Sequence, residues 1–275
     1  MNFDENSLEL MTIDMLREQG YDYLAGEDIL RDYHDVILED RLFTSLQKIN
    51  PTLQESTIQE TVRQIKNLSQ NNVIRNNKEF SRFLHGGVPV SEYTFENGTT
   101  NTSVHLIDYE NVENNDFLVV NQFTIIEHSE KRPDVIVFIN GLPLIVFELK
   151  SMTREDVDLE DGYRQLKNYM NNHIPSLFYY NQFLVVSDGA TAKAGTITCN
   201  YQRFNEWKKT SITDEAVNHN THEPLIRGMM SKEVVLDLIR NFILFQDDAK
   251  ILPAYHQYYG KALEKASPWY FMPVI

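Results

Sequence analysis

The sequence predicts an α/β fold in which helices flank a mixed β-sheet. Residues 132–150 read RPDVIVFINGLPLIVFELK, which is two apolar runs separated by Asn140-Gly141. Neither run alternates polar with apolar residues, and this pattern is typical of a central strand pair that is covered on both faces. A predicted helix over 159–171 leads to a predicted strand over 182–187, and this strand-helix-strand order favours a right-handed crossover within one sheet.

The N-terminal part is predicted to be mainly helical. Helices are expected over residues 5–19, 39–49 and 56–69. Gly20 would end the first helix, and Asn50-Pro51 would separate the second from the third. Ser56 and Gln59 have the spacing of a helix cap at the start of the third helix.

Strands and one further helix are expected after residue 87. The predicted strands cover residues 88–95, 102–108 and 117–127. The first two enclose Asn97-Gly98, a dipeptide that favours a hairpin turn. Ser187-Asp188-Gly189 would close the strand over 182–187, with Asp188 accepting backbone hydrogen bonds. The apolar periodicity of residues 232–246 predicts a helix that closes the domain.

Three charged side chains stand in the two central apolar runs. Asp134 precedes the first run, and Glu148 and Lys150 end the second. An unpaired buried charge costs several kcal/mol, so strands of this kind rarely carry charges without a chemical role. Two carboxylates can hold a divalent ion while an ammonium orients the attacking water, which is what phosphodiester hydrolysis needs. The alternative is an ordinary hairpin whose charges face solvent.

The spacing of these charges sets a condition on the hairpin. Glu148 and Lys150 point to the same face of a strand, because side chains alternate with a period of two. Asp134 shares that face only if the numbers of two directly opposed residues add up to an even sum, as 134 and 148 do. A regular two-residue loop gives an odd sum. We therefore expect an odd-length loop from Asn140 to Leu142 with Gly141 left-handed, or a bulge near Asp134.

The composition is unusual for a protein that binds DNA. The 275-residue chain has a formal net charge of −15. Phosphate contacts come mainly from lysine and arginine, so binding would have to be local. The candidate contacts are Lys131, Arg132, Arg154, Arg164, Lys167 and the segment 203–209. The acidic balance suggests that strong DNA affinity resides in other domains or in partner subunits.

Cysteine content and hydropathy indicate the cellular compartment. The single Cys199 excludes an intrachain disulfide framework and suits a reducing environment. No apolar run approaches the roughly 20 residues that span a membrane, and residues 1–20 contain no signal core. We therefore expect a cytoplasmic protein without membrane contact.

The charged motif resembles a known family. A Pro-Asp followed by Glu-x-Lys in an apolar frame is the pattern of the PD-(D/E)xK nucleases, and RPDVIVFINGLPLIVFELK is closer to one branch, the motor or restriction (R) subunit of type I restriction enzymes. The resemblance extends to NDFLVVNQF at 115–123, QLKNYM at 165–170, IPSLFYYNQFLVVSDG at 174–189 and AGTIT at 194–198. It covers most of residues 1–240 and implies a PD-(D/E)xK restriction-endonuclease-like core.

The resemblance implies a set of site residues. Asp134 and Glu148 would bind the metal ion together with the backbone carbonyl of Leu149. Lys150 would contact the scissile phosphate or the nucleophilic water. Gln165 and Tyr169 match the family's Q-x-x-x-Y element, and positions four apart share one face of a helix. The alternative for this pair is a polar helix surface that contacts only water.

A further acid usually comes from the first helix of this fold. Glu9 stands where we expect it, on the helical face that carries Ile13 and Leu16, so it would point inward. Asp14 is the rival but falls off that face. The alternative for Glu9 is a plain acid near the helix N-terminus, where the helix dipole favours a negative charge.

The C-terminal segment resembles a different part of the same subunit. KILPAYHQYYGK at 250–261 resembles the segment before the helicase-type motor, but no Walker A loop follows. The expected division is an endonuclease domain over 1–246, then a linker and truncated start of a motor over 247–275. The alternative is an ordinary amphipathic tail helix.

The resemblance implies a type I site-specific deoxyribonuclease. It would use Mg²⁺, with Mn²⁺ as a substitute, and the missing motor would use ATP. Its partners would be double-stranded DNA and the methyltransferase and specificity subunits of a restriction-modification complex. One alternative is an assembly module that docks on those subunits and is silent in isolation. Another is a stand-alone repair nuclease or junction resolvase, which the motor-like tail disfavours.

Overall fold

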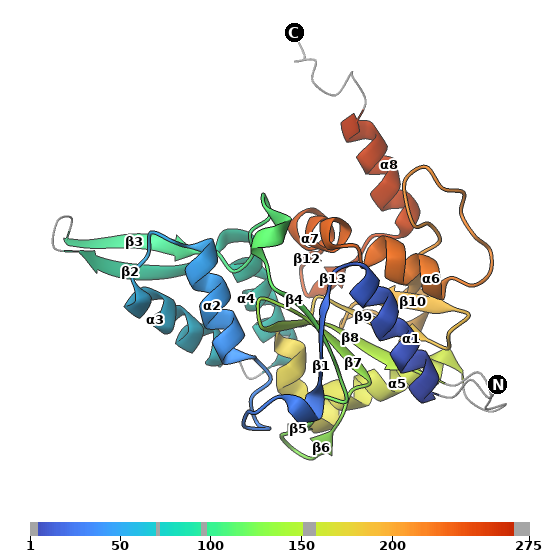
Figure 1. Ribbon diagram of the computed structural model, residues 1–275, viewed down its shortest axis with the longest axis horizontal. Coiled ribbons are helices and arrows are strands. Elements are labelled where there is room, and N and C mark those ends of the chain that lie inside the picture. The colour runs from blue at the N-terminus through green and yellow to red at the C-terminus, as the bar shows by residue number, and fades with distance from the viewer. Residues whose placement is uncertain (1–4, 70–71, 95–97, 151–157, 267–275) are drawn as a thin grey trace, which may run out of the picture.

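The computed structural model describes residues 5–69, 72–94, 98–150 and 158–266. Within them the chain builds a seven-stranded mixed sheet in the order β1-β4-β7-β8-β9-β10-β11 (Figure 1). The strands are β1 Asp22–Ala25, β4 Phe117–Asn121, β7 Val135–Ile139, β8 Leu142–Leu149, β9 Phe183–Ser187, β10 Ala192–Gly195 and β11 Asn205–Glu206. β1 runs parallel to β4 and β8 parallel to β9, and the other neighbouring pairs are antiparallel. The expected α/β fold with a mixed sheet is confirmed.

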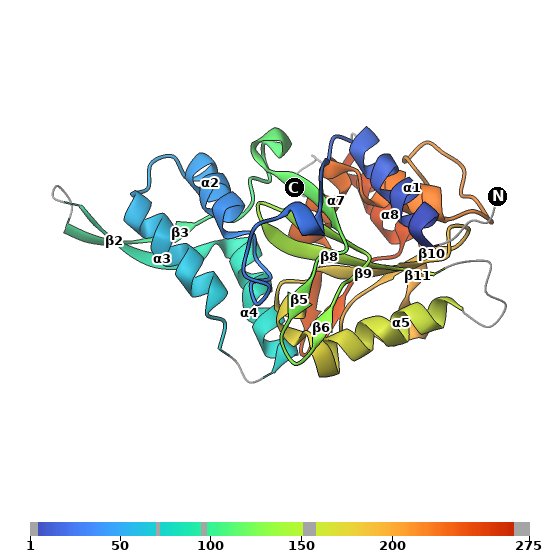
Figure 2. The same ribbon diagram turned by 60° about the horizontal axis from the view of Figure 1, so that its bottom comes forward.

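Helices cover both faces of this sheet. Figure 2 shows α1 (Glu5–Glu18) and α5 (Leu159–Asn168) on opposite sides of it. α1 packs against β1, β4 and β8, whereas α5 packs against β8 and β9. Every residue of β7 and β8 is buried, as the absence of alternation predicted. The remaining helices are α2 Glu39–Ile49, α3 Glu55–Lys66, α4 Val73–Gly86, α6 His222–Pro224, α7 Lys232–Asn241 and α8 Tyr255–Ala266.

Three two-stranded ribbons complete the described part of the fold. They are β2 Val88–Thr94 with β3 Gly98–Val104, β5 Ile125–Ile126 with β6 Glu130–Lys131, and β12 Leu244–Gln246 with β13 Ala249–Ile251. The ribbon β2–β3 projects away from the central sheet beside α2 and α3 (Figure 1). It lies away from the end of β7 and β8 that carries Asp134 and Glu148, which α1 and α5 cover (Figure 1).

Several elements differ from the sequence expectation. The strand expected over 102–108 is β3 and begins at Gly98, while Asn97 of the expected turn lies outside the described residues. The helix expected from Ser56 begins at Glu55, and its N-cap Gln54 makes no side-chain capping bond. The helix expected over 232–246 ends at Asn241, because the chain then turns into β12. α4, whose N-cap Asn72 accepts two backbone hydrogen bonds, was not expected.

The C-terminal elements pack onto the body of the sheet. The hairpin β12–β13 crosses the expected domain boundary between residues 246 and 247. Its Lys250 is buried, and the Lys250 Nζ donates to Asn77 Oδ1 (2.9 Å) and to the Asn181 carbonyl (2.7 Å). α8 is attached through ring contacts of Tyr258 and Tyr259 with Trp207. The division after residue 246 stays a prediction. Among the described residues, no helix combines the length and apolar character that crossing a membrane requires.

The central hairpin meets the register condition through a bulge. Ile139 pairs with Leu142, so Asn140-Gly141 is a two-residue loop with φ values of 54° and 76°. The expected odd-length loop is therefore wrong. The register then shifts, and Leu144 is the extra residue on β8. The freed Leu144 carbonyl accepts from the Gln182 N–H (2.6 Å). The bulge lies beside the turn rather than near Asp134, because this carbonyl needs the donor at the start of β9.

The turn itself is anchored in the interior. Asn140 is fully buried, and its side chain donates to the Leu106 carbonyl (2.9 Å) and accepts from the Asp116 N–H (2.7 Å). Gly141 lies under the start of α2, where its carbonyl accepts from the Leu38 N–H (2.9 Å). Both residues adopt the left-handed conformation that a two-residue hairpin turn requires.

A buried histidine joins three elements around the sheet. His222 at the start of α6 contacts Ser187 Oγ at the end of β9 (2.7 Å) and Thr12 Oγ1 of α1 (3.3 Å). It is 2% exposed. Burial lowers the pKa of the imidazole from 6.5 to about 4, although the charges of Asp188 and Glu223 act in the opposite direction.

We predict that Gly141→Ala destabilises the domain by roughly 3 kcal/mol or more. A Cβ at this position would lie 2.5 Å from Leu38 O and 2.6 Å from Leu42 N, with φ at +76°. Gly98→Ala is the matched control, because φ is +65° there and no atom lies within 4 Å of the added Cβ. The control should cost roughly 1–2 kcal/mol. Equal losses in urea unfolding would contradict the packing argument.

We predict that His222 makes the protein less stable in acid. Between pH 6.5 and about 4 the unfolded chain binds a proton at this ring and the folded chain does not. Its contribution is therefore complete above pH 6.5 and falls with pH, by about 3 kcal/mol at pH 4. Urea unfolding across this range should show a flatter pH dependence for His222→Gln. His219→Gln, three residues away on an exposed side chain, should keep the wild-type slope.

Candidate active site

The three central charges lie together at one end of the sheet. Val135 pairs with Phe147 across β7 and β8, so the preceding Asp134 stands opposite Glu148. Asn121 pairs with Val135, and the next residue, Gln122, donates its N–H to the Asp134 carbonyl (3.1 Å). Gln122, Asp134 and Glu148 therefore form a row across three adjacent strands. The bulge at Leu144 gives the even index sum that puts both acids on one face.

Asp134 is a buried acid with one backbone donor. Its Oδ2 accepts from the Leu149 N–H at 2.7 Å. Burial raises the pKa of this carboxyl to about 6, while the Leu149 hydrogen bond and the Lys150 charge lower it. The cost of burying the Asp134 carboxylate therefore exceeds what the Leu149 hydrogen bond and the Lys150 charge return.

Glu148 is still more deeply buried and is only half satisfied. Its side chain is fully shielded from solvent, and Oε1 accepts from Lys150 Nζ at 2.6 Å. Oε2 is buried and finds no donor among the described residues. Burial raises the pKa of Glu148 to about 8, repulsion from Asp134 raises it further, and Lys150 opposes both. Two carboxyl groups therefore share one ammonium group.

Lys150 continues into a chain of side-chain hydrogen bonds. Its Nζ donates to Gln165 Oε1 (2.8 Å), and Gln165 Nε2 donates to the Tyr169 hydroxyl (2.6 Å). Burial raises the pKa of Tyr169 well above its usual range, so its hydroxyl stays protonated. Gln165 lies on α5 and Tyr169 begins the π-helical turn Tyr169–His173. The structure thus brings the expected pair together, and it faces Lys150 instead of solvent.

α5 packs in ordinary van der Waals contact over the two charged side chains of β8. A Cβ at Gly162 would lie 3.6 Å from the Cγ atoms of both Glu148 and Lys150. The start of α5 is held by a capping box between Asp158 and Asp161. The helix therefore covers the stems of the two charged side chains and leaves little space for water around them.

Glu9 lies beside this group but is held differently. It is 5% exposed, so it points inward as expected, and its charge raises the pKa of Asp134. Its oxygens accept from Asn121 Nδ2 (2.6 Å) and from Gln122 Nε2 (2.8 Å). Asp14, the rival acid, is exposed and pairs with Arg17. Sequence reasoning missed Asn121 and Gln122, whose one visible signal is a polar pair directly after an apolar strand.

The donor set suits a hard divalent cation. Carboxylate and carbonyl oxygens are the ligands that Mg²⁺ prefers. The buried, unsatisfied Oε2 of Glu148 and the excess of acids over ammonium groups both call for positive charge. Among the residues that the structure describes, no three His, Cys, Asp or Glu side chains are grouped closely enough to form a complete set of ligands. Asp134 and Glu148 fit a cation that also binds other oxygen atoms.

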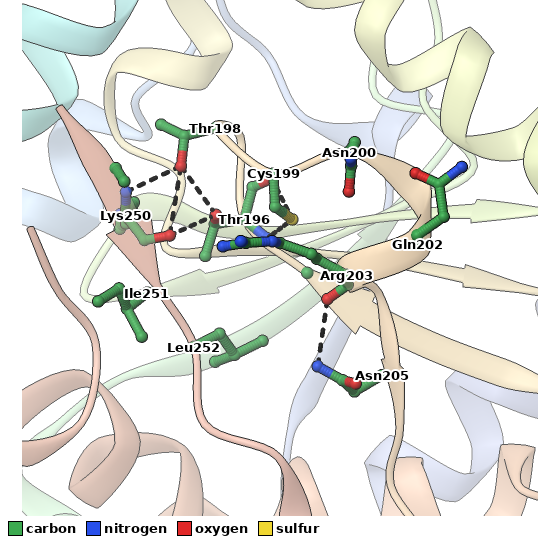
Figure 3. Close-up of a pocket in the computed structure, with 12 residues that line it drawn as sticks. Thr196, Thr198, Cys199, Asn200, Gln202, Arg203, Asn205, Lys250, Ile251 and Leu252 are labelled. Carbon is green, nitrogen blue, oxygen red and sulfur yellow. Dashed lines mark hydrogen bonds between the residues drawn. The ribbon is translucent and has the colours of Figure 1, made fainter.

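A pocket of about 550 Å³ lies between the segment 195–205 and the strand β13. None of the predicted catalytic or metal-binding residues lines it, although Arg203 of the candidate phosphate contacts does. Figure 3 shows Thr196 and Thr198 of this pocket bonded to the backbone of Lys250. The pocket is therefore separate from the row of acids.

The expected phosphate contacts are mostly occupied by other groups. Arg132 pairs with Glu130, and Arg164 pairs with Glu160 and Asp161. Lys167 donates to the Ile197 carbonyl and Lys208 pairs with Glu206. Arg154 lies outside the described residues. The described surface thus compensates many of its basic groups internally.

Comparisons with known proteins agree with the geometry. The family model of the type I restriction enzyme R protein N terminus matches residues 2–203. The chain is similar to the type I restriction enzyme HindI endonuclease subunit of Haemophilus influenzae, with 35% identity over 94% of this chain and 26% of that protein. The putative MjaIXP endonuclease subunit of Methanocaldococcus jannaschii is 31% identical over 92% of this chain and 26% of its own length.

A more distant relative shows the same coverage. The type I restriction enzyme SauMSSORF170P endonuclease subunit of Staphylococcus aureus is 24% identical over 94% of this chain and 26% of that protein. The chain therefore spans about a quarter of the length of these relatives. Because the family model covers well over half of the 275 residues, the chain belongs to the family of type I restriction enzyme R protein N-termini.

Proposed function

We propose that this chain is the Mg²⁺-dependent nuclease domain of a type I restriction R subunit and that it hydrolyses phosphodiester bonds in double-stranded DNA. The observation that carries the proposal is the buried group of Asp134, Glu148 and Lys150 at the end of β7 and β8. A domain that only docked on partners would gain nothing from two buried acids that share one ammonium group. The names of the relatives, all endonuclease subunits, support the same activity.

Asp134 and Glu148 would hold the metal ion, together with the carbonyl of Leu149. When bound, Mg²⁺ lowers the pKa of water and offsets negative charge on the leaving oxygen. Mn²⁺ would substitute for it. The Leu149 N–H bond keeps the Asp134 carboxylate oriented along the end of β8. Burial keeps bulk water from both acids, which strengthens their attraction for a cation.

Lys150 would stabilise the negative charge that grows on the phosphate. Its side chain is 11% exposed, so the charge acts in a poorly screened environment. Gln165 Oε1 accepts a hydrogen bond from Nζ, and Gln165 in turn donates to Tyr169; together these bonds limit the directions in which Nζ can point. The protein supplies position and charge, and no covalent intermediate with a side chain is needed.

The intact subunit would act in a larger complex. The chain spans about a quarter of its relatives, so ATP-driven translocation by a motor and contacts with methyltransferase and specificity subunits belong to the proposal. The net charge of −15 and the internally paired basic residues favour a nuclease that depends on other parts of the complex for DNA affinity. An assembly role without cleavage in isolation is the second candidate. The acidic net charge and the paired basic residues support it as well.

We predict that Mg²⁺ or Mn²⁺ is required for cleavage of supercoiled and linear DNA, and that Lys150→Ala lowers the rate by roughly 100-fold or more. Lys48→Ala on the exposed face of α2 is the matched lysine control and should cleave at the wild-type rate. Cleavage without added metal, or full activity in Lys150→Ala, would contradict the proposed site. No cleavage by the wild-type chain would favour the silent assembly module.

We predict a graded effect along the hydrogen-bond chain. Gln165→Ala removes a direct partner of Lys150 and should lower the cleavage rate roughly 10- to 100-fold, the range found for outer partners of active-site groups. Tyr169→Phe keeps Gln165 and should lower it less. Single-turnover rates at saturating metal would measure both. A larger loss in Tyr169→Phe than in Gln165→Ala would show that the tyrosine acts directly rather than through Gln165.

A further inference from the structure

The backbone is strained at the residue that follows β4. Gln122 has a φ of 50°, which lies in the left-handed region. Apart from Gly, Asn and Asp, residues seldom adopt this conformation. It follows the last strand residue, Asn121, and interrupts what the sequence predicts as one strand over 117–127. A strained residue that is neither Gly nor Asn points to a function for its side chain.

The bend changes the direction of one side chain. In a regular strand, Asn121 and Gln122 would point to opposite faces of the sheet. Here both amides reach the same carboxylate, Asn121 Nδ2 at Glu9 Oε1 and Gln122 Nε2 at Glu9 Oε2. The left-handed conformation therefore gives Glu9 a donor on each of its oxygens.

The surrounding chain is shaped to keep the bend. A Cβ at Gly26 would lie 2.6 Å from the Gln122 carbonyl oxygen and 2.7 Å from that of Asn121, so only glycine fits beside the bend. On its other side, the Gln122 N–H donates to the Asp134 carbonyl (3.1 Å). Tyr23 adds a bond from its hydroxyl to Asn121 Oδ1 (3.0 Å).

Glu9 is held next to another acid without a cation of the protein. No lysine or arginine of the described residues forms an ion pair with it, and its two oxygens accept only from the amides of Asn121 and Gln122 in the described hydrogen bonds. Repulsion between the two carboxylates would move Glu9 away unless it is restrained. The amides of Asn121 and Gln122 supply the restraint and leave the negative charge uncompensated.

We propose that Gln122, together with Asn121, is a positioning residue that holds the Glu9 carboxylate beside Asp134, so that Glu9 strengthens the binding of a divalent cation. The inference rests on the proposed function. Gln122 bonds to Glu9 through its side chain and to Asp134 through its backbone, and so links the acid on α1 to the acid on β7. Because the three acids do not form a complete ligand set, Glu9 acts on the cation through charge or through a water molecule.

The test is Mn²⁺ binding by the whole chain, measured by isothermal titration calorimetry without DNA. Gln122→Met keeps the side-chain length and removes the donor. Gln122→Gly removes the donor and relieves the left-handed strain. Both variants should bind Mn²⁺ roughly tenfold more weakly, as is typical when a partner of a metal ligand is lost. Urea unfolding of Gln122→Gly without metal should match the wild type, which a purely structural role would not allow.

A double-mutant cycle shows whether Gln122 acts through Glu9. Glu9→Gln should weaken Mn²⁺ binding, and Gln122→Gly should add no further loss in the Glu9→Gln background. Additive losses, or wild-type affinity in both single variants, would overturn the inference. Asp134→Asn separates the two proposals. If the wild type binds Mn²⁺ and Asp134→Asn does not, the metal site stands even when the Gln122 inference fails. If the wild type binds no Mn²⁺, both the proposed metal site and the Gln122 inference are wrong.

Discussion

The site depends on one extra residue in β8. Side chains alternate along a strand, so a shift of one position would move every charge of β8 to the opposite face. The two-residue turn at Asn140-Gly141 starts the hairpin in the register that separates Asp134 from Glu148, and the bulge at Leu144 reverses it. The donor that stabilises the bulge comes from Gln182, so the pairing of β8 with β9 and the position of the acids are set together.

The charges at this end of the sheet are unbalanced, which supports the cation site that we propose. Glu148 and Asp134 are buried with raised pKa values, and one of the Glu148 oxygens has no donor in the described part of the chain. A single lysine cannot compensate both acids at neutral pH. The uncompensated acids therefore lower the stability of the folded chain, and the proposed divalent cation would remove this cost. Such conflict between stability and local charge is typical of functional sites.

The elements around the acids restrict their movement from both faces of the sheet. α5 covers the stems of Glu148 and Lys150, and its Gln165 bonds to the ammonium group. On the other face, α1 brings Glu9 to the strained end of β4. Figure 2 shows how the two helices enclose the end of the sheet where these strands finish. Glu9 lies 112 and 113 residues before its partners Asn121 and Gln122, so this part of the site exists only in the folded chain.

The sequence by itself determined the fold class, the family and the three central charges, because apolar runs without alternation and charges within them are local patterns. It also set a condition: Asp134 shares a face with Glu148 only if the numbers of directly opposed residues have an even sum. Only the tertiary structure decided that the even sum comes from a bulge at Leu144, since that depends on a donor from Gln182. The sequence also did not predict that Asn121 and Gln122 bind Glu9. The left-handed bend at Gln122 is held by Gly26 and Asp134, which are distant in sequence, so no local propensity of the segment predicts it.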